Sequence, residues 1–228
     1  MTVPEYLRMA DISRVTVVKN IEQAEKTESK PRGRPPAFVR ETVLAAAREI
    51  FWEHGYEGAS IADLTAAMKI TPQSLYAAFR SKAVLYKEAL DQYRRMPRPL
   101  VGDPLRDDVD TVTAFDRFLR NSALLFSAPE HPKGCMISTA VLNCATENGE
   151  IADYVSSLRG GMLAAFTARL ERGISDGDIR PDTNPKAMAR FLGAIVQGMS
   201  VQARDGADAQ DLLDVVALAI NQLASHRA

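Results

Sequence analysis

The sequence predicts an all-α fold in which a small N-terminal helical domain precedes a larger helical one. Three observations predict this class. Apolar residues recur at helical spacing in most segments after residue 36, no segment alternates apolar and polar residues as a strand does, and Pro or Gly separates the periodic segments. A chain of 228 residues with 46% hydrophobic content can bury one large core or two modest ones.

The first helix is expected from about Phe38 to His54, because Val43, Ala47 and Phe51 fall on one helical face. Glycines mark its end. Apart from the segment 60–82, the later helices are expected over residues 81–95, 110–127, 134–146, 150–174, 184–204 and 208–225.

Residues 60–82 contain two short helices joined by a tight turn and are the most informative segment of the chain. Ser60 can cap the first helix with Asp63 completing a capping box, and Thr71 can cap the second with Pro72 at its first position. The second helix has a thin apolar stripe, so its remaining faces need a partner outside its own domain. A helix of this size fits the major groove of B-DNA, which makes double-stranded DNA the expected partner.

The run from Arg34 to about Tyr93 resembles the N-terminal DNA-binding domain of TetR/AcrR-type transcriptional regulators. A weaker match between Gly134 and Gly206 resembles the ligand-sensing half of one branch of that family. The resemblance implies a homodimeric DNA-binding regulator, expected to be a repressor of a palindromic operator that a small apolar or amphipathic effector releases. The matching elements are the helix ending in Phe51, His54-Gly55-Tyr56, Ser60-Ile61, Leu75-Tyr76, Phe79 and Ser81-Lys82.

We therefore expect a flexible extension over residues 1–30, a helix-turn-helix domain with a basic arm over 31–82, and an effector-binding and dimerisation domain over 83–228. Gln73 suits a bidentate contact to adenine, and Lys82 suits a phosphate. The expected DNA-binding residues are Arg32, Arg34, Ser60, Thr71, Gln73, Ser74, Tyr76 and Lys82.

Two positions depart from the family pattern. Lys69 occupies the turn position where the family usually has glycine, at a cost of about 1 kcal/mol if its φ is positive. Ala77 and Ala78 stand where relatives often carry larger side chains, so direct reading of bases by this helix is expected to be sparse.

The charge is unevenly distributed along a chain whose net charge is −1. Residues 30–98 hold 12 basic and 7 acidic residues, whereas residues 100–228 hold 12 basic and 17 acidic ones. A basic end on a near-neutral protein fits contact with a phosphate backbone. Within that end, Arg32 and Arg34 flank a glycine in a proline-rich arm. This arm can either insert into a minor groove of DNA or act as a basic linker that contacts only phosphates.

The last two expected helices carry broad apolar faces, which the resemblance assigns to a dimer interface. The alternative is an ordinary intramolecular core. The residues assigned to the interface are Leu192, Ile195, Val196, Met199, Leu212, Val216, Ala219 and Leu223.

An effector pocket is expected among the middle helices, because aromatic and methionine side chains make adaptable apolar walls. The alternative for each of these side chains is the core. The candidates are Phe115, Phe118, Leu119, Phe126, Met136, Asn143, Met162 and Phe166.

Cys135 raises a second hypothesis, a thiol-redox-responsive DNA-binding dimer, because a thiol in the first turn of a helix has a lowered pKa. A third is a DNA-binding dimer without any effector. We expect no enzymatic activity, cofactor or metal, since no catalytic motif or metal-ligand spacing occurs. We also expect a cytoplasmic location and no membrane partner, because no apolar run reaches the length of a membrane span.

Overall fold

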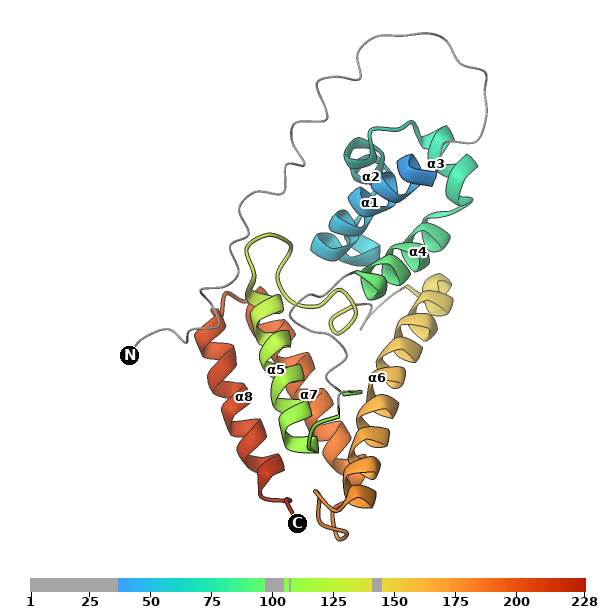
Figure 1. The fold of residues 1–228 in the computed structure, drawn as a ribbon. Coiled ribbons are helices and arrows are strands. Elements are labelled where there is room, and N and C mark those ends of the chain that lie inside the picture. The colour runs from blue at the N-terminus through green and yellow to red at the C-terminus, as the bar shows by residue number, and fades with distance from the viewer. Residues whose placement is uncertain (1–36, 97–104, 107, 141–144) are drawn as a thin grey trace. The chain divides into compact units, whose positions relative to one another are not determined.

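A computed structural model describes residues 37–96, 105–106, 108–140 and 145–228. Within these ranges the elements are helices, joined by turns and one isolated bridge between Ile179 and Arg227 (Figure 1). The predicted all-α class is therefore confirmed. No helix in the described part of the chain is both long and apolar enough to cross a membrane. The proposed extension over residues 1–30 and the arm with Arg32 and Arg34 lie outside the described ranges.

Four helices form the N-terminal head, which we define as residues 37–95: α1 (Ala37–Gly58), α2 (Ile61–Met68), α3 (Pro72–Phe79) and α4 (Lys82–Arg95). Each of α2, α3 and α4 begins at a side-chain cap. The hydroxyl oxygens of Ser60, Thr71 and Ser81 accept hydrogen bonds from the backbone N–H groups three residues further on. These caps satisfy donors that a helix start leaves unpaired, so the three boundaries are fixed locally.

An aromatic cluster forms the core of the head. The Tyr86 ring meets Phe51 edge-on at 4.9 Å between centroids and lies 5.1 Å from Tyr56, while Trp52 meets Tyr93 edge-on at 4.9 Å. Such pairs add about 0.5–1.5 kcal/mol each beyond the area they bury. Because Tyr86 and Tyr93 belong to α4, the core of the head extends beyond residue 82 into that helix.

The remaining helices are α5 (Thr111–Ser127), η2 (Thr146–Asn148), α6 (Gly149–Asp176), α7 (Pro185–Arg204) and α8 (Ala209–Ala224). Helix α5 packs on α8 and α7, and α7 also packs on α6 (Figure 1). Their shared core is separate from that of the head and includes Phe115, Phe166, Leu192 and Val216.

The helix predicted over residues 134–146 is wrong at residues 134–140, which form turns. Gly134 has a φ of 77°, and a Cβ atom there would lie 2.6 Å from the carbonyl oxygen of Ser200. The next residue, Cys135, donates its backbone N–H to the Ser200 hydroxyl at 2.8 Å. The close approach at Gly134 and this hydrogen bond hold the start of the segment against α7.

The apolar faces assigned to a dimer interface lie mostly inside one chain. Seven of the eight predicted side chains are at most 3% exposed, and Ile195 is half-buried. Within the single chain these helices pack on α5, on α6 and on each other, which is the arrangement of the intramolecular alternative. The seven are Leu192, Val196, Met199, Leu212, Val216, Ala219 and Leu223.

A buried arginine joins the ends of α5 and α6. Arg169 is 3% exposed and donates to the Thr111 hydroxyl and to the Val109 carbonyl, both at 2.5 Å. Asp178 accepts hydrogen bonds from the backbone N–H and the hydroxyl of Thr111. Burial lowers the pKa of Arg169, which the neighbouring carboxylates partly offset. Gly173 lies against this group, where a Cβ atom would be 2.1 Å from the Thr111 hydroxyl oxygen.

We expect Gly173→Ala to lower the free energy of unfolding by about 1–3 kcal/mol, because the added methyl overpacks the Thr111–Asp178 group. The matched control is Gly160→Ala in the same helix, where no atom lies within 4 Å of the added Cβ. That change should instead raise stability by about 0.5–1 kcal/mol. Urea unfolding of both variants measures the difference, and equal effects would contradict this packing.

Candidate nucleic-acid interface and effector cavity

The outer face of α3 is exposed and uncharged. Gln73, Ser74 and Tyr76 all lie at the surface, and the Tyr76 side chain is 47% exposed. The inner face, Leu75 and Phe79, is buried in the core of the head. The predicted contact residues on α3 thus share one accessible surface, whose neighbours Ala77 and Ala78 add little bulk.

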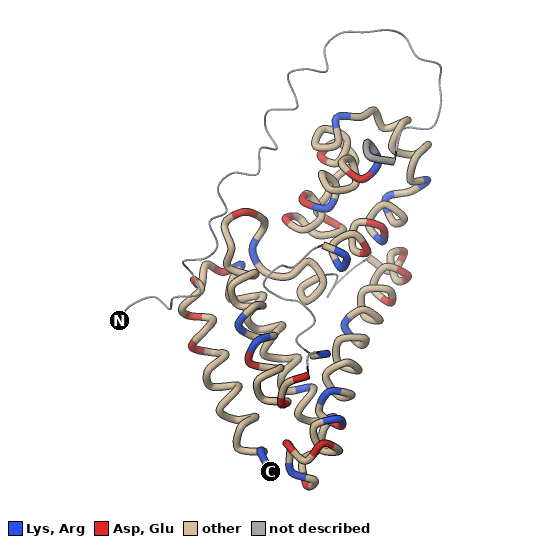
Figure 2. Tube along the Cα trace, viewed as in Figure 1, with Lys and Arg blue, Asp and Glu red and all other residues tan. Residues whose placement is uncertain are grey.

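Basic residues lie at both ends of α3 instead of along it. Figure 2 shows the basic and acidic residues along the whole described chain. Lys69 precedes the helix, and Arg80 and Lys82 follow it. Charges placed in this way suit phosphates on either side of a groove, because phosphate contacts set the register of a protein on DNA while base edges give the sequence.

Two of the predicted contact hydroxyls are engaged in helix caps. The Ser60 hydroxyl donates to Asp63 Oδ2 at 2.6 Å and accepts from the Asp63 N–H. The hydrogen bonds that the Asp63 carboxylate accepts from the Ser60 hydroxyl and backbone N–H lower the pKa of Asp63. The Thr71 hydroxyl accepts from the Ser74 N–H and lies 2.9 Å from the Ser74 hydroxyl. Their first role in the free protein is to fix the two helix starts that orient α3.

Lys82 lies over the ring of Tyr56, with Nζ 4.7 Å from the ring centroid. Burial lowers the pKa of Lys82, which nearby Glu57 partly offsets. The Lys82 side chain is therefore half-buried against the head, whereas Gln73, Ser74 and Tyr76 on α3 are exposed.

The turns at the two ends of α3 have unusual backbone conformations. Lys69 is left-handed, with φ 53° and ψ 42°, as expected for a position where the family usually has glycine. Arg80 has φ 66° and ψ −45°, and the Ser81 N–H donates to the Phe79 carbonyl at 2.7 Å. This is a γ-turn of the rare, strained kind. Sequence reasoning missed it, because arginine gives no sign of a positive φ.

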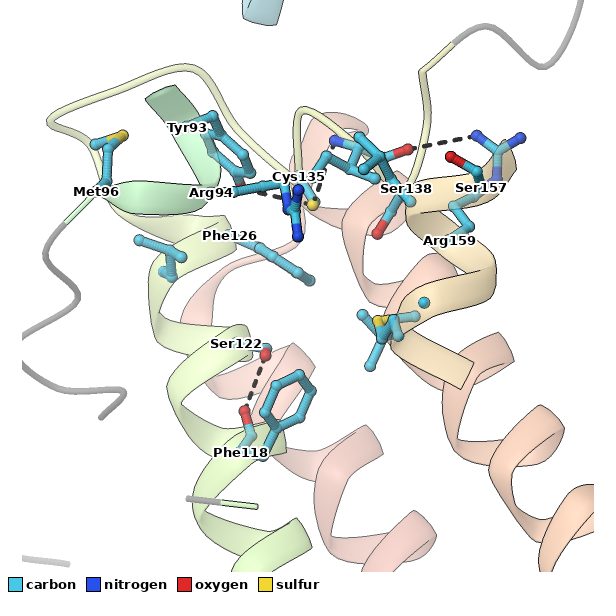
Figure 3. Close-up of a pocket in the computed structure, with 16 residues that line it drawn as sticks. Tyr93, Arg94, Met96, Phe118, Ser122, Phe126, Cys135, Ser138, Ser157 and Arg159 are labelled. Atoms are coloured by element: carbon cyan, nitrogen blue, oxygen red, sulfur yellow. Dashed lines mark hydrogen bonds between the residues drawn. The ribbon is translucent and has the colours of Figure 1, made fainter. Parts of the chain in front are cut away.

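A cavity of about 600 Å³ lies among α4, α5, α6 and α7. Phe118, Leu125 and Met162 are among its apolar walls, while polar side chains gather at the end nearest α4 (Figure 3). There the Tyr93 hydroxyl donates to Cys135 Sγ at 3.4 Å, and Arg159 donates to the Ala140 carbonyl at 2.9 Å. The cavity thus combines an apolar body with one polar, basic end.

The predicted pocket residues fall into four groups. Phe118, Phe126 and Met162 line the cavity. Phe115, Leu119 and Phe166 are fully buried core residues, Met136 lines a different cavity, and Asn143 lies outside the described residues. Sequence reasoning missed the polar part of the lining, which consists of Tyr93, Arg94, Ser122, Ser138, Ser157 and Arg159.

Cys135 lies on the wall of this cavity, but not in a helix. Residues 134–140 form turns and bends, so the helix start on which the redox hypothesis rested is not present. The sulfur accepts weak hydrogen bonds from the Tyr93 hydroxyl and from the Ile137 N–H, both at 3.4 Å. Cys144 lies outside the described residues.

The helix-turn-helix with an exposed second helix, together with a separate helical core beside it, defines a DNA-binding transcriptional regulator. Residues 43–89 match the profile of the bacterial regulatory proteins of the tetR family, and residues 114–217 match that of the tetracyclin repressor-like C-terminal domain. The chain belongs to the TetR family.

Individual relatives agree with this assignment. The chain is 30% identical to the HTH-type transcriptional repressor ComR of Escherichia coli K12, over 82% of this chain and 89% of ComR. It is 27% identical to the repressor BdcR of the same organism, over 85% of this chain and 93% of BdcR. Its structure is similar to that of a cysteine-substituted variant of the TetR-family regulator CifR in complex with 26-base-pair operator DNA. The TM-score is 0.79, with 39% identity over 84% of this chain and 100% of the other.

We expect Arg80→Gly to be more stable than Arg80→Ala by about 1 kcal/mol, because glycine adopts a positive φ without steric cost. Both variants lose the guanidinium group, so the difference between them reports only the strain of the γ-turn. Thermal or urea unfolding of the pair provides the measurement. Equal stability would show that this backbone conformation carries no strain.

Proposed function

We propose that this protein is a repressor that binds a palindromic operator as a homodimer and leaves DNA when a small amphipathic molecule occupies the 600 Å³ cavity. The observation that carries the proposal is the position of α4. Its first residue, Lys82, follows α3 after a short turn, and its last turn supplies Tyr93 and Arg94 to the cavity wall. One rigid helix therefore joins the proposed sensor to the proposed reader of DNA.

Double-stranded DNA is the proposed partner of α3. The exposed amide of Gln73 offers the bidentate donor and acceptor pair that matches adenine in the major groove. Lys69, Arg80 and Lys82 supply positive charge at the two ends of the helix. The complex of CifR with operator DNA supports this use of the same fold.

The proposed dimer surface lies on the outer faces of α7 and α8, next to the residues first assigned to it. Large apolar side chains remain exposed there: Phe191 is 37% exposed, Val201 44% and Leu218 72%. Ile195 and Gly198 lie on the same face of α7 as Phe191. A second copy that covers this surface would place two heads on one side of DNA, about 34–36 Å apart for successive major grooves.

The shape and polarity of the cavity favour an effector with an apolar body and a polar end. A cavity of this size is typical of small-molecule sites. To release DNA, the effector must bind more tightly to the conformation that does not fit the operator.

We expect Gln73→Ala to weaken the preference for the operator over unrelated DNA by about 1–3 kcal/mol. Lys82→Ala should instead weaken binding to all sequences alike and reduce the dependence of affinity on salt. Gel-shift titrations of both variants at several salt concentrations separate the two effects. The assignment of α3 would be wrong if both variants bound like the parent.

We expect Leu218→Glu to convert the dimer to a monomer, since it buries a charge in the proposed interface. Val84→Glu is the control, because Val84 is also an exposed apolar residue but lies on α4. Size-exclusion chromatography with light scattering gives the mass of each variant. A Leu218→Glu protein that stays dimeric would place the interface elsewhere.

A further inference from the structure

Helix α6 contains two adjacent glycines, Gly160 and Gly161, in its interior. Both lie at the surface, and the helix continues through them without a break. A Cβ atom at either position would meet no other atom within 4 Å, and neither glycine has a positive φ. Neither space nor backbone conformation therefore requires glycine here, although glycine weakens the interior of a helix relative to alanine. Since sharp bends in helices occur at glycines, this pair is the point at which α6 bends most easily.

The part of α6 that precedes the glycine pair is packed as a part of the head. Val155 is completely buried in the core of the head. The Tyr154 hydroxyl donates to Asp91 Oδ1 on α4 at 2.8 Å, and Glu150 forms an ion pair with Lys87 on the same helix. Polar and apolar contacts thus both attach this part of α6 to α4.

The part of α6 that follows the glycine pair belongs to the second core, which it shares with α5, α7 and α8. Phe166 and Leu170 are completely buried there. Leu163 packs closely on α7, where a Cβ atom on Gly193 would lie 2.5 Å from the Leu163 side chain. The boundary between the two cores therefore crosses α6 at the glycine pair.

The 600 Å³ cavity has walls on both sides of this boundary. Ser157 and Leu158 come from the part of α6 that precedes the pair, whereas Met162 comes from the part that follows it. Tyr93 of the head and Phe118 of the second core face the same cavity (Figure 3). A change in the bend of α6 would therefore change the shape of the cavity.

We propose that Gly160 and Gly161 form a hinge between the head and the second core. The head and the first part of α6 move about this hinge as one body. Arg204 joins α7 to the end of α1 through a long side chain, which can follow a small rotation. A molecule that fills the cavity fixes the angle of the hinge and with it the position of α3, a step that rests on the proposed function.

Hydrogen exchange of the free protein tests the hinge without DNA or an effector. We expect the amides of residues 160–165 to exchange faster than those on either side of them in α6, because hydrogen bonds around a glycine pair open more readily. Replacing both glycines by alanine should slow this exchange about tenfold after correction for intrinsic rates. The control is Gly149→Ala at the first residue of α6, where the added Cβ also meets no atom within 4 Å, and it should leave these amides unchanged.

The hinge would be absent if these amides exchanged no faster than their neighbours in the parent protein. An unchanged exchange rate in the double-alanine variant would equally overturn it. Because both glycines lie in open space, alanine at these positions leaves the packing intact, so the variant is expected to fold.

Operator binding tests whether movement at the hinge reaches the head. One base pair inserted at the centre of the palindrome shifts the two half-sites relative to each other, and the heads of the proposed dimer must adjust. Relative to the parent, the double-alanine variant should lose about tenfold more affinity on this insertion, since its α6 is stiffer. Gly149→Ala should behave like the parent.

The measured quantity is the ratio of the affinities for the original and the lengthened operator, so a uniform change in affinity does not affect it. Equal ratios in the parent and the double-alanine variant would overturn the coupling of the hinge to the head. A parent protein that binds no palindromic DNA would instead contradict the proposed function, and the exchange rates would still decide whether the hinge exists.

Discussion

The burial of one face of α4 against α1 is the constraint on which the rest of the structure depends. Tyr86, at the centre of that face, packs against two aromatic rings of α1, and Leu85 and Leu90 are completely buried beside it. Through this contact α4 becomes part of the head, and α3 is held between them by Phe79. Because the same helix reaches the large cavity with Tyr93, the position of α3 and the shape of the cavity are set by one packing arrangement.

Short-range capping interactions made the helix starts of the N-terminal head predictable from the sequence. Ser60, Thr71 and Pro72 act on backbone groups within a few residues, so they specify the same helix starts in almost any surroundings. The γ-turn at Arg80 and the turns that follow Gly134 were not predictable. At the turns that follow Gly134, the contact with Ser200 on α7, which is distant in sequence, holds the backbone. At Arg80 the residue type gives no sign of the positive φ.

The candidate dimer surface and effector cavity were predictable only in part. An apolar stripe on a helix predicts that the stripe is covered, but it does not indicate whether a second chain, a ligand or another helix of the same chain covers it. Leu212 and Val216 look equally suited to a second chain or to α5, and in the structure α5 covers them. The aromatic residues of α5 divide in the same way, since Phe118 lines the cavity while Phe115 lies in the core. Polar members of the cavity wall, such as Arg159, had no sequence signal, because isolated polar residues on amphipathic helices are ordinary.

The hydrogen bonds from Arg204 to the end of α1 bear on whether the head can fold when it is separated from the rest of the chain. A guanidinium group from α7 satisfies the carbonyls of Trp52 and Glu53 in the last turns of α1, and Met136 and Val155 complete the core of the head. A fragment of residues 37–96 would therefore expose apolar surface and unpaired carbonyls that the intact chain covers. The head thus depends on the rest of the chain for part of its packing. Grafting this head onto an unrelated C-terminal domain would require that domain to supply hydrogen bonds to the same carbonyls and the same apolar contacts.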